Sequence, residues 1–157
     1  MKSIYEEAHK FKKEYPSTVA FRIKAHSKVA QKHLNSNEEV LFVFCGQKNF
    51  SSWRIINSCV IALTTKRIII AQKRLLWGYF FTTITPDLYN DLKVRKNLIW
   101  SDIEIDTVKE KVYLSNINPD GAIKAEKVIT DFMMKEKKKI WKRYLLVFFL
   151  FYYVLPF

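Results

Sequence analysis

The sequence is poor in glycine and cysteine, and this scarcity excludes several classes of site. Only 3 of the 157 residues are glycine. Gly46, Gly78 and Gly121 stand too far apart to build the glycine-rich loop of a dinucleotide-binding or P-loop motif. The 2 cysteines cannot form a disulfide framework or a four-thiolate zinc site. Residues 1–13 are charged throughout and lack the apolar run of an export signal, so the reducing cytosol is the expected compartment.

Acidic residues are also in the minority, at 15 against 27 basic residues, which gives a net charge of +12. The excess lies at the two ends: residues 1–33 hold 8 basic and 3 acidic side chains, and residues 135–157 hold 6 and 1. Such an excess is typical of a chain that binds nucleic acid or an anionic lipid surface, or of a solvated helix face. No nucleic-acid-binding motif occurs, and an acidic strand over 101–107 would repel phosphate, so nucleic acid is disfavoured.

Two helices are expected before the first strand. Residues 2–15 predict a short polar helix that Pro16 ends, because the residue before proline is pushed out of the helical region. Ser17 or Thr18 then predicts the start of a second helix that reaches about Leu34.

The middle of the chain predicts seven short strands and then one amphipathic helix over 122–133. The strands are expected at 40–45, 58–64, 67–73, 79–85, 88–95, 99–107 and 109–114. The sixth alternates most clearly, which predicts one buried face and one wet face carrying Asp102, Glu104 and Asp106. Strands segregated from helices favour an α+β fold, a small antiparallel barrel or sandwich closed at one end by the last helix.

Several stretches in residues 34–134 resemble the bacterial pleckstrin-homology-like domains of the YokE-like type. The most specific runs from Leu63 to Lys73 (LTTKRIIIAQK), and the others are residues 37–41, 45–49, 84–87, 106–110 and 114–117. The resemblance implies the PH fold: a barrel of two roughly orthogonal antiparallel sheets, seven strands in all, with a C-terminal helix capping one open end. It brings no catalytic residue and no cofactor, and it leaves function open.

Catalysis has little support in the sequence. His9, His26 and His33 all lie in the N-terminal arm without the carboxylate spacing of a metal motif, which predicts surface or helix-packing histidines. Cys45 and Cys59 lie in apolar strands and are expected to be buried rather than nucleophilic. We therefore expect no catalytic residue, metal or cofactor.

The loop after the first strand carries a weaker signal. Lys48 and Arg54 could pair with lipid phosphates there, while Phe50 and Trp53 reach into the membrane interface. The alternative is that the two aromatic residues pack on the barrel or on the N-terminal helices.

The C-terminal segment carries the strongest signal. Basic residues expected to contact anionic lipid precede an uncharged, aromatic stretch expected to enter the membrane. The basic candidates are Lys137, Lys138, Lys139, Lys142 and Arg143, and the inserting candidates are Trp141, Tyr144, Leu145, Phe148, Phe149, Phe151 and Tyr152. At 1.5 Å per residue the stretch from residue 144 onward makes about 21 Å of helix, short of a core of about 30 Å, which predicts partial or interfacial insertion. The alternatives are burial against the domain, burial in an oligomer, and disorder.

Three segments follow from these patterns: a helical arm over 1–33, a PH-like domain over 34–134, and a basic then apolar tail over 135–157. The expected function is a non-catalytic binding or scaffolding module. It would be cytoplasmic, peripheral at the inner face of the cell membrane, and would present its barrel to a protein or peptide. The alternative is a soluble PH-like domain that self-associates and buries its apolar tail in a homo-oligomer.

Overall fold

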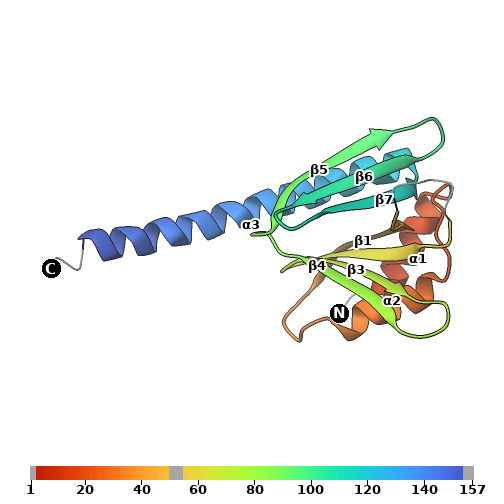
Figure 1. The fold of residues 1–157 in the computed structure, drawn as a ribbon, viewed down its shortest axis with the longest axis horizontal. Coiled ribbons are helices and arrows are strands. Elements are labelled where there is room, and N and C mark those ends of the chain that lie inside the picture. Colours follow the sequence, from red (N-terminus) through yellow and green to blue (C-terminus); the bar gives the residue numbers. More distant parts are fainter. Residues whose placement is uncertain (1–2, 50–54, 154–157) are drawn as a thin grey trace.

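A computed structural model describes residues 3–49 and 55–153, and within them three helices and seven strands follow one another as in Figure 1. The helices are α1 (Ile4–Glu14), α2 (Ile23–Lys32) and α3 (Pro119–Tyr153). The strands are β1 (Val40–Gln47), β2 (Ser58–Thr64), β3 (Ile68–Lys73), β4 (Tyr79–Ile84), β5 (Tyr89–Lys96), β6 (Ser101–Thr107) and β7 (Lys111–Ile117).

The seven strands form one antiparallel system in the order β4-β3-β2-β1-β7-β6-β5. Each hairpin pairs neighbours in the chain, and the four-stranded and three-stranded halves join where Gln47 of β1 lies opposite Ser115 of β7. The α+β class and the barrel-like arrangement of seven strands followed by a helix are therefore confirmed.

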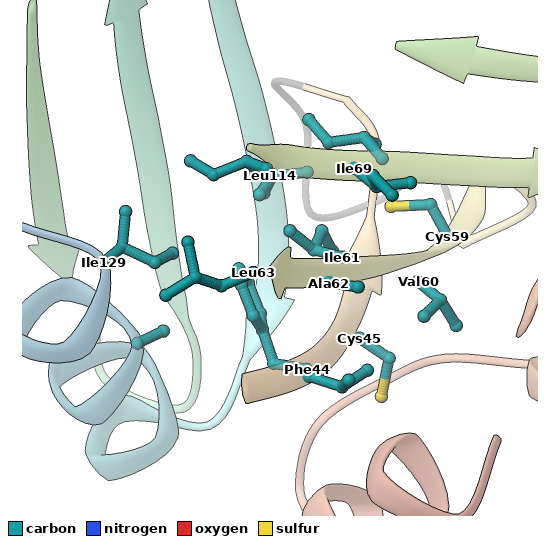
Figure 2. Packing of buried hydrophobic residues seen from close by; sticks show 14 of the residues in the cluster. Phe44, Cys45, Cys59, Val60, Ile61, Ala62, Leu63, Ile69, Leu114 and Ile129 are labelled. Atoms are coloured by element: carbon teal, nitrogen blue, oxygen red, sulfur yellow. The ribbon is translucent and has the colours of Figure 1, made fainter. Parts of the chain in front are cut away.

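β2 is buried along its whole length, so both of its faces are covered. α1 packs on β1 and α2 packs on β2 and β3, which covers one face. The other face belongs to the core beneath α3, where Phe44, Leu63 and Ile129 turn toward one another (Figure 2). Because Ile4, Ala8 and Phe11 of α1 belong to the same core cluster, the N-terminal helices are part of the folded unit.

The second helix begins later than expected, at Ile23 instead of Ser17 or Thr18. The backbone amides of residues before Ile23 instead donate hydrogen bonds to segments that lie far along the chain. The Val19 amide donates to the Asn116 carbonyl at 2.8 Å, and the Phe21 amide donates to Ser58 Oγ at 2.8 Å. Arg22, in the left-handed region at φ 53°, then turns the chain into α2.

The acidic face of the sixth strand is not fully wet as expected. Ile103 and Ile105 are buried, but so is Glu104, whose carboxylate accepts hydrogen bonds from Arg95 at 3.0 Å and Lys111 at 2.8 Å. These two bonds outweigh the effect of burial and hold the pKa of Glu104 below its ordinary value. The β5–β6–β7 register places both cations beside it.

Gly121, near the start of α3, lets α1 approach closely. A Cβ at this position would lie 2.8 Å from Cζ of Phe11 and 3.0 Å from Cγ of Tyr15. We expect Gly121→Ala to lower the free energy of unfolding by about 1–3 kcal/mol, since overpacking a tight contact costs that much. Urea denaturation measures this, with Lys127→Ala on the exposed side of α3 as the control. An unchanged or raised stability would show that α1 moves aside freely.

Candidate functional site

The C-terminal half of α3 projects from the domain with its apolar side chains uncovered (Figure 1). Every side chain from Tyr144 to Tyr152 is more than half exposed, with exposed fractions from 52% at Val147 to 73% at Tyr152. Trp141 is exposed as well. The structure therefore leaves the predicted inserting residues Trp141, Tyr144, Leu145, Phe148, Phe149, Phe151 and Tyr152 in the open, with none packed into the barrel core.

This half of the helix is apolar around its whole circumference. At 3.6 residues per turn, an unbroken apolar run from Tyr144 to Tyr152 covers two and a half turns and leaves no polar side. A helix that is apolar all round is typical of an environment that surrounds it, unlike the one-sided stripe of a surface helix. In the described part of the chain, no helix is long and apolar enough to cross a membrane.

The basic residues of the tail that were predicted to contact lipid divide into two groups. Lys137 donates to the Tyr89 carbonyl at 2.6 Å, and Lys139 pairs with Glu136 at 2.6 Å, so both have partners within the domain or the helix. The side chains of Lys138, Lys142 and Arg143 form no hydrogen bond or ion pair with any described residue. We call these three residues the basic collar.

A groove of about 490 Å³ lies where α2 meets the β3–β4 hairpin. Its apolar walls come from Phe21, Ile55, Ile56, Leu75 and Phe80, and its basic ones from Arg22, Lys73 and Arg74. Among the described residues that line it, none is acidic. Leu76 and Trp77, which complete the hairpin, extend the apolar surface beyond the groove, with Trp77 79% exposed.

Both arginines of the groove are held by local contacts. The guanidinium of Arg74 lies 4.9 Å from the centre of the Phe80 ring, and both terminal nitrogens of Arg22 lie 3.5 Å from the Arg74 carbonyl. His26, also in the groove, accepts a hydrogen bond at Nδ1 from the Lys73 amide at 2.8 Å. Burial, reinforced by the nearby Arg22 charge, lowers the pKa of His26 to about 4, so this ring is neutral at pH 7. The positive charge of the groove therefore comes from Arg22, Lys73 and Arg74.

The groove and the basic collar lie at opposite ends of the barrel. β1, β3 and β5 end, and β2, β4 and β6 begin, at the groove end, where α3 also starts. α3 then runs along the barrel and leaves it beside Asp87 and Tyr89, at the other end (Figure 1).

Lys48, which follows β1, lies at the groove end, so the structure does not bring this predicted lipid contact together with the collar. Arg54, Phe50 and Trp53 lie outside the described residues.

The sequence did not reveal the groove, because three segments distant in the sequence build it. The one available signal was Leu75-Leu76-Trp77, an apolar run inside a turn that ends at Gly78. Turn residues are usually polar, so large apolar side chains there indicate a surface that contacts something else.

The histidines and cysteines occupy structural positions. His33 Nε2 lies 3.0 Å from the Tyr79 hydroxyl, and His9 packs beside Tyr5. Cys45 and Cys59 are fully buried, as expected, and burial raises the pKa of Cys45 to about 12 and that of Cys59 further. Thiols held protonated in this way are inert as nucleophiles. Among the described residues no group of three or more His, Cys, Asp or Glu side chains could hold a metal ion.

Comparison with known proteins identifies the fold family. The model of a family described as "Bacterial PH domain" matches residues 34–131. The chain belongs to the bacterial PH domain family. This assignment confirms the resemblance seen in the sequence, and a PH-like domain of this kind suggests a binding module, since PH domains generally bind lipids or proteins and are generally non-catalytic. The PH match excludes α1, α2 and the projecting half of α3.

Two solved structures are similar to this PH domain. One is a DUF1696 family protein with a pleckstrin-homology domain from Shewanella loihica PV-4, at 14% identity over 69% of this chain and 96% of that one, with a TM-score of 0.45. The other is a pleckstrin homology domain from Shewanella amazonensis SB2B, at 13% identity over 74% of this chain and 90% of that one, with a TM-score of 0.46. Among curated proteins, none matches the chain.

Proposed function

We propose that this chain is a non-catalytic binding module that attaches to the cytoplasmic face of the cell membrane through the distal half of α3. The observation that carries the proposal is the all-round exposure of the apolar side chains from Tyr144 to Tyr152. Burying one such side chain is worth roughly 1.5–3 kcal/mol, so leaving nine of them in water is strongly unfavourable.

A lipid environment fits this segment better than a dimer does. A dimer of two helices buries one stripe on each and leaves the opposite side of each helix in water. Acyl chains surround the helix and cover every side at once. The aromatic residues Trp141, Tyr144 and Tyr152 are types that favour the membrane interface.

The basic collar supplies the preference for an anionic leaflet. Lys142 and Arg143 lie directly before the uncharged segment, and Lys138 lies about one turn before Lys142, at the level where lipid headgroups would meet the helix. Cations near such a surface contribute about 1 kcal/mol each. Their long stems also let the charged ends reach the headgroups while the helix enters more deeply.

This arrangement supports a functional division of the chain. Among the described residues Met133 is the last core residue of α3, which supports a boundary near residues 134 and 135 between the folded domain and the membrane-contacting tail, within a continuous helix. The domain over 34–134, with the arm over 1–33 packed on it, would then stand in the aqueous phase and present its barrel to a protein or peptide.

Removal of the collar charges tests the proposal. The triple variant Lys138→Gln/Lys142→Gln/Arg143→Gln should bind vesicles containing phosphatidylglycerol about 100-fold more weakly than the unchanged chain, because about 3 kcal/mol of attraction is lost. Binding to neutral phosphatidylcholine vesicles should not change. Cosedimentation with vesicles measures both affinities, and added salt should weaken the anionic binding of the unchanged chain.

The matched control is Lys10→Gln/Lys13→Gln/Lys28→Gln, which removes the same charge from exposed positions on α1 and α2. It should retain most of the vesicle binding. If the two triple variants lose equal vesicle affinity, the binding depends on the net charge of the chain and not on the position of the basic collar. A full chain that ignores both kinds of vesicle and forms a defined oligomer would support self-association through the apolar segment instead.

A further inference from the structure

We propose that the groove beside α2 is the docking site for an acidic, amphipathic segment of a partner protein. The proposal rests on the proposed function for one point, which is that the groove end of the barrel faces the aqueous phase. The groove itself depends on Phe21, Arg22 and His26, which precede the residues matched by the PH family.

Several large apolar side chains in and beside the groove are exposed to solvent. Ile56 is 85% exposed, Leu75 is 80% exposed, and Leu76 and Trp77 continue the same surface along the hairpin. Phe21 and Phe80, which also line the groove, are half exposed. Aromatic and large aliphatic side chains gathered around a hollow are typical of the centre of a protein interface.

The charge of the groove selects an acidic occupant. Arg22 and Arg74 lie close enough for the guanidinium of Arg22 to contact the carbonyl of Arg74, and neither forms an ion pair with a described carboxylate. Lys73 adds a third cation, and the neutral His26 adds none. A guanidinium presents two parallel N–H donors that match a carboxylate, so Asp or Glu side chains would complement this rim.

The position and extent of the surface favour a protein over a lipid. The groove lies between the start of α2 and the β3–β4 hairpin. Figure 1 shows the projecting half of α3 at the other end of the barrel, so a straight α3 that enters a bilayer holds the groove away from it. A single small amphiphile would fill the groove but would leave Leu76 and Trp77 uncovered, because neither lines it. A peptide segment covers the groove and the hairpin together.

Contacts within the chain hold two walls of the groove in place. The left-handed turn at Arg22 is the point where an extended segment becomes α2, and the Arg22 carbonyl accepts the amides of Ala25 and His26. On the other wall, the stacking of Arg74 on Phe80 and the positive φ of Gly78 shape the hairpin. A preformed site loses little conformational freedom on binding.

A peptide selection on the full chain tests this proposal. A phage library of random 12-residue peptides is panned against the chain with its apolar helix covered by neutral phosphatidylcholine nanodiscs. We expect recovered peptides to combine Asp or Glu with two or three large apolar residues. Their dissociation constants, measured by fluorescence anisotropy, should rise at least ten-fold for Arg22→Gln/Arg74→Gln and for Ile56→Ser/Leu75→Ser.

The matched control is Lys127→Gln/Lys135→Gln, which removes two exposed cations from α3 and should leave the affinity within two-fold of the unchanged chain. Replacing the apolar residues of a selected peptide by serine, with its acidic residues kept, should abolish binding. Selection without such a pattern, or equal binding to the groove variants, would overturn the proposal. Loss of anionic-vesicle binding in the groove variants would also overturn the proposal, because it would show that the groove contacts a bilayer.

The same panning can be repeated without lipid on Phe148→Glu/Phe149→Glu, in which the apolar helix carries two new charges. Because this helix touches no part of the groove, peptide binding should persist in that variant. Peptide binding therefore tests the groove proposal and vesicle binding tests the membrane proposal, and either proposal can fail without the other.

Discussion

Glutamate at positions 148 and 149 is expected to abolish the binding of this chain to anionic vesicles. Each substitution of phenylalanine removes roughly 1.5–3 kcal/mol of apolar burial. Each new carboxylate adds a cost of about 2.5 kcal/mol if it enters the hydrocarbon. Together the two changes in Phe148→Glu/Phe149→Glu should weaken binding by at least about 1,000-fold, to below detection by cosedimentation.

Both phenylalanines lie on the exposed, projecting part of α3, so the folded domain should not be affected. Circular dichroism and a urea midpoint equal to that of the unchanged chain would verify this. The loss of vesicle binding can then be assigned to the helix itself.

The matched control is Leu75→Glu/Leu76→Glu, which places the same two charges on two exposed leucines at the other end of the barrel. This variant should keep its vesicle affinity within a few-fold. If both double variants lose binding equally, the membrane contact involves both ends of the molecule and α3 is not its main determinant. If the tail variant retains binding, the proposed membrane attachment is wrong.

The strands could be predicted from the sequence because their signal is local. The runs Ser58–Thr64 and Ile68–Lys73 are rich in Val and Ile, and the turn between them is short, so a hairpin was the natural interpretation. The core helix over 122–133 also showed its period directly. The pattern did not show that this helix continues without a break to Tyr153, because the basic and aromatic residues that follow form no apolar stripe along one side.

The features that the sequence could not reveal depend on contacts between distant segments. The start of α2 is set by Asn116 and Ser58, which accept the amides of Val19 and Phe21. The burial of Glu104 depends on cations brought by the neighbouring strands. The groove likewise joins the N-terminal segment to two hairpins, and no periodicity within one segment encodes such a juxtaposition.

The ion pair between Glu38 and Arg67 is expected to be the most important polar interaction for stability. The side chain of Glu38 is fully buried, and Arg67 donates to it through Nε at 2.9 Å and Nη2 at 3.0 Å. Thr64 Oγ1 at 2.6 Å and the Asn35 amide at 3.1 Å complete its hydrogen bonds. Burial alone would raise the pKa of this carboxyl, but these four donors outweigh it and lower the pKa below 4.5.

Arg67→Ala should therefore lower the free energy of unfolding by about 3–5 kcal/mol, because it leaves a buried carboxylate without its cation. Replacing both partners, in Glu38→Leu/Arg67→Met, should recover much of this loss, since an apolar pair leaves no buried charge. Lys66→Ala in the same turn should change stability by less than about 0.5 kcal/mol, as an exposed position. A small effect of Arg67→Ala would mean that water reaches Glu38 and replaces the arginine.

The pH dependence separates the ion pair from simple packing. The lowered pKa of Glu38 gives the unchanged chain a stability that is present above pH 4.5 and is lost as the pH falls through the pKa of the folded state. In Arg67→Ala the buried carboxyl lacks its cation, so protonation favours the folded state and the deficit should shrink as the pH falls from 7 toward 4. His26, whose pKa falls from 6.5 to about 4 on folding, destabilises both proteins over that interval and cancels in their difference. A deficit that stays constant with pH would assign the loss to the packing of the Arg67 side chain instead of its charge.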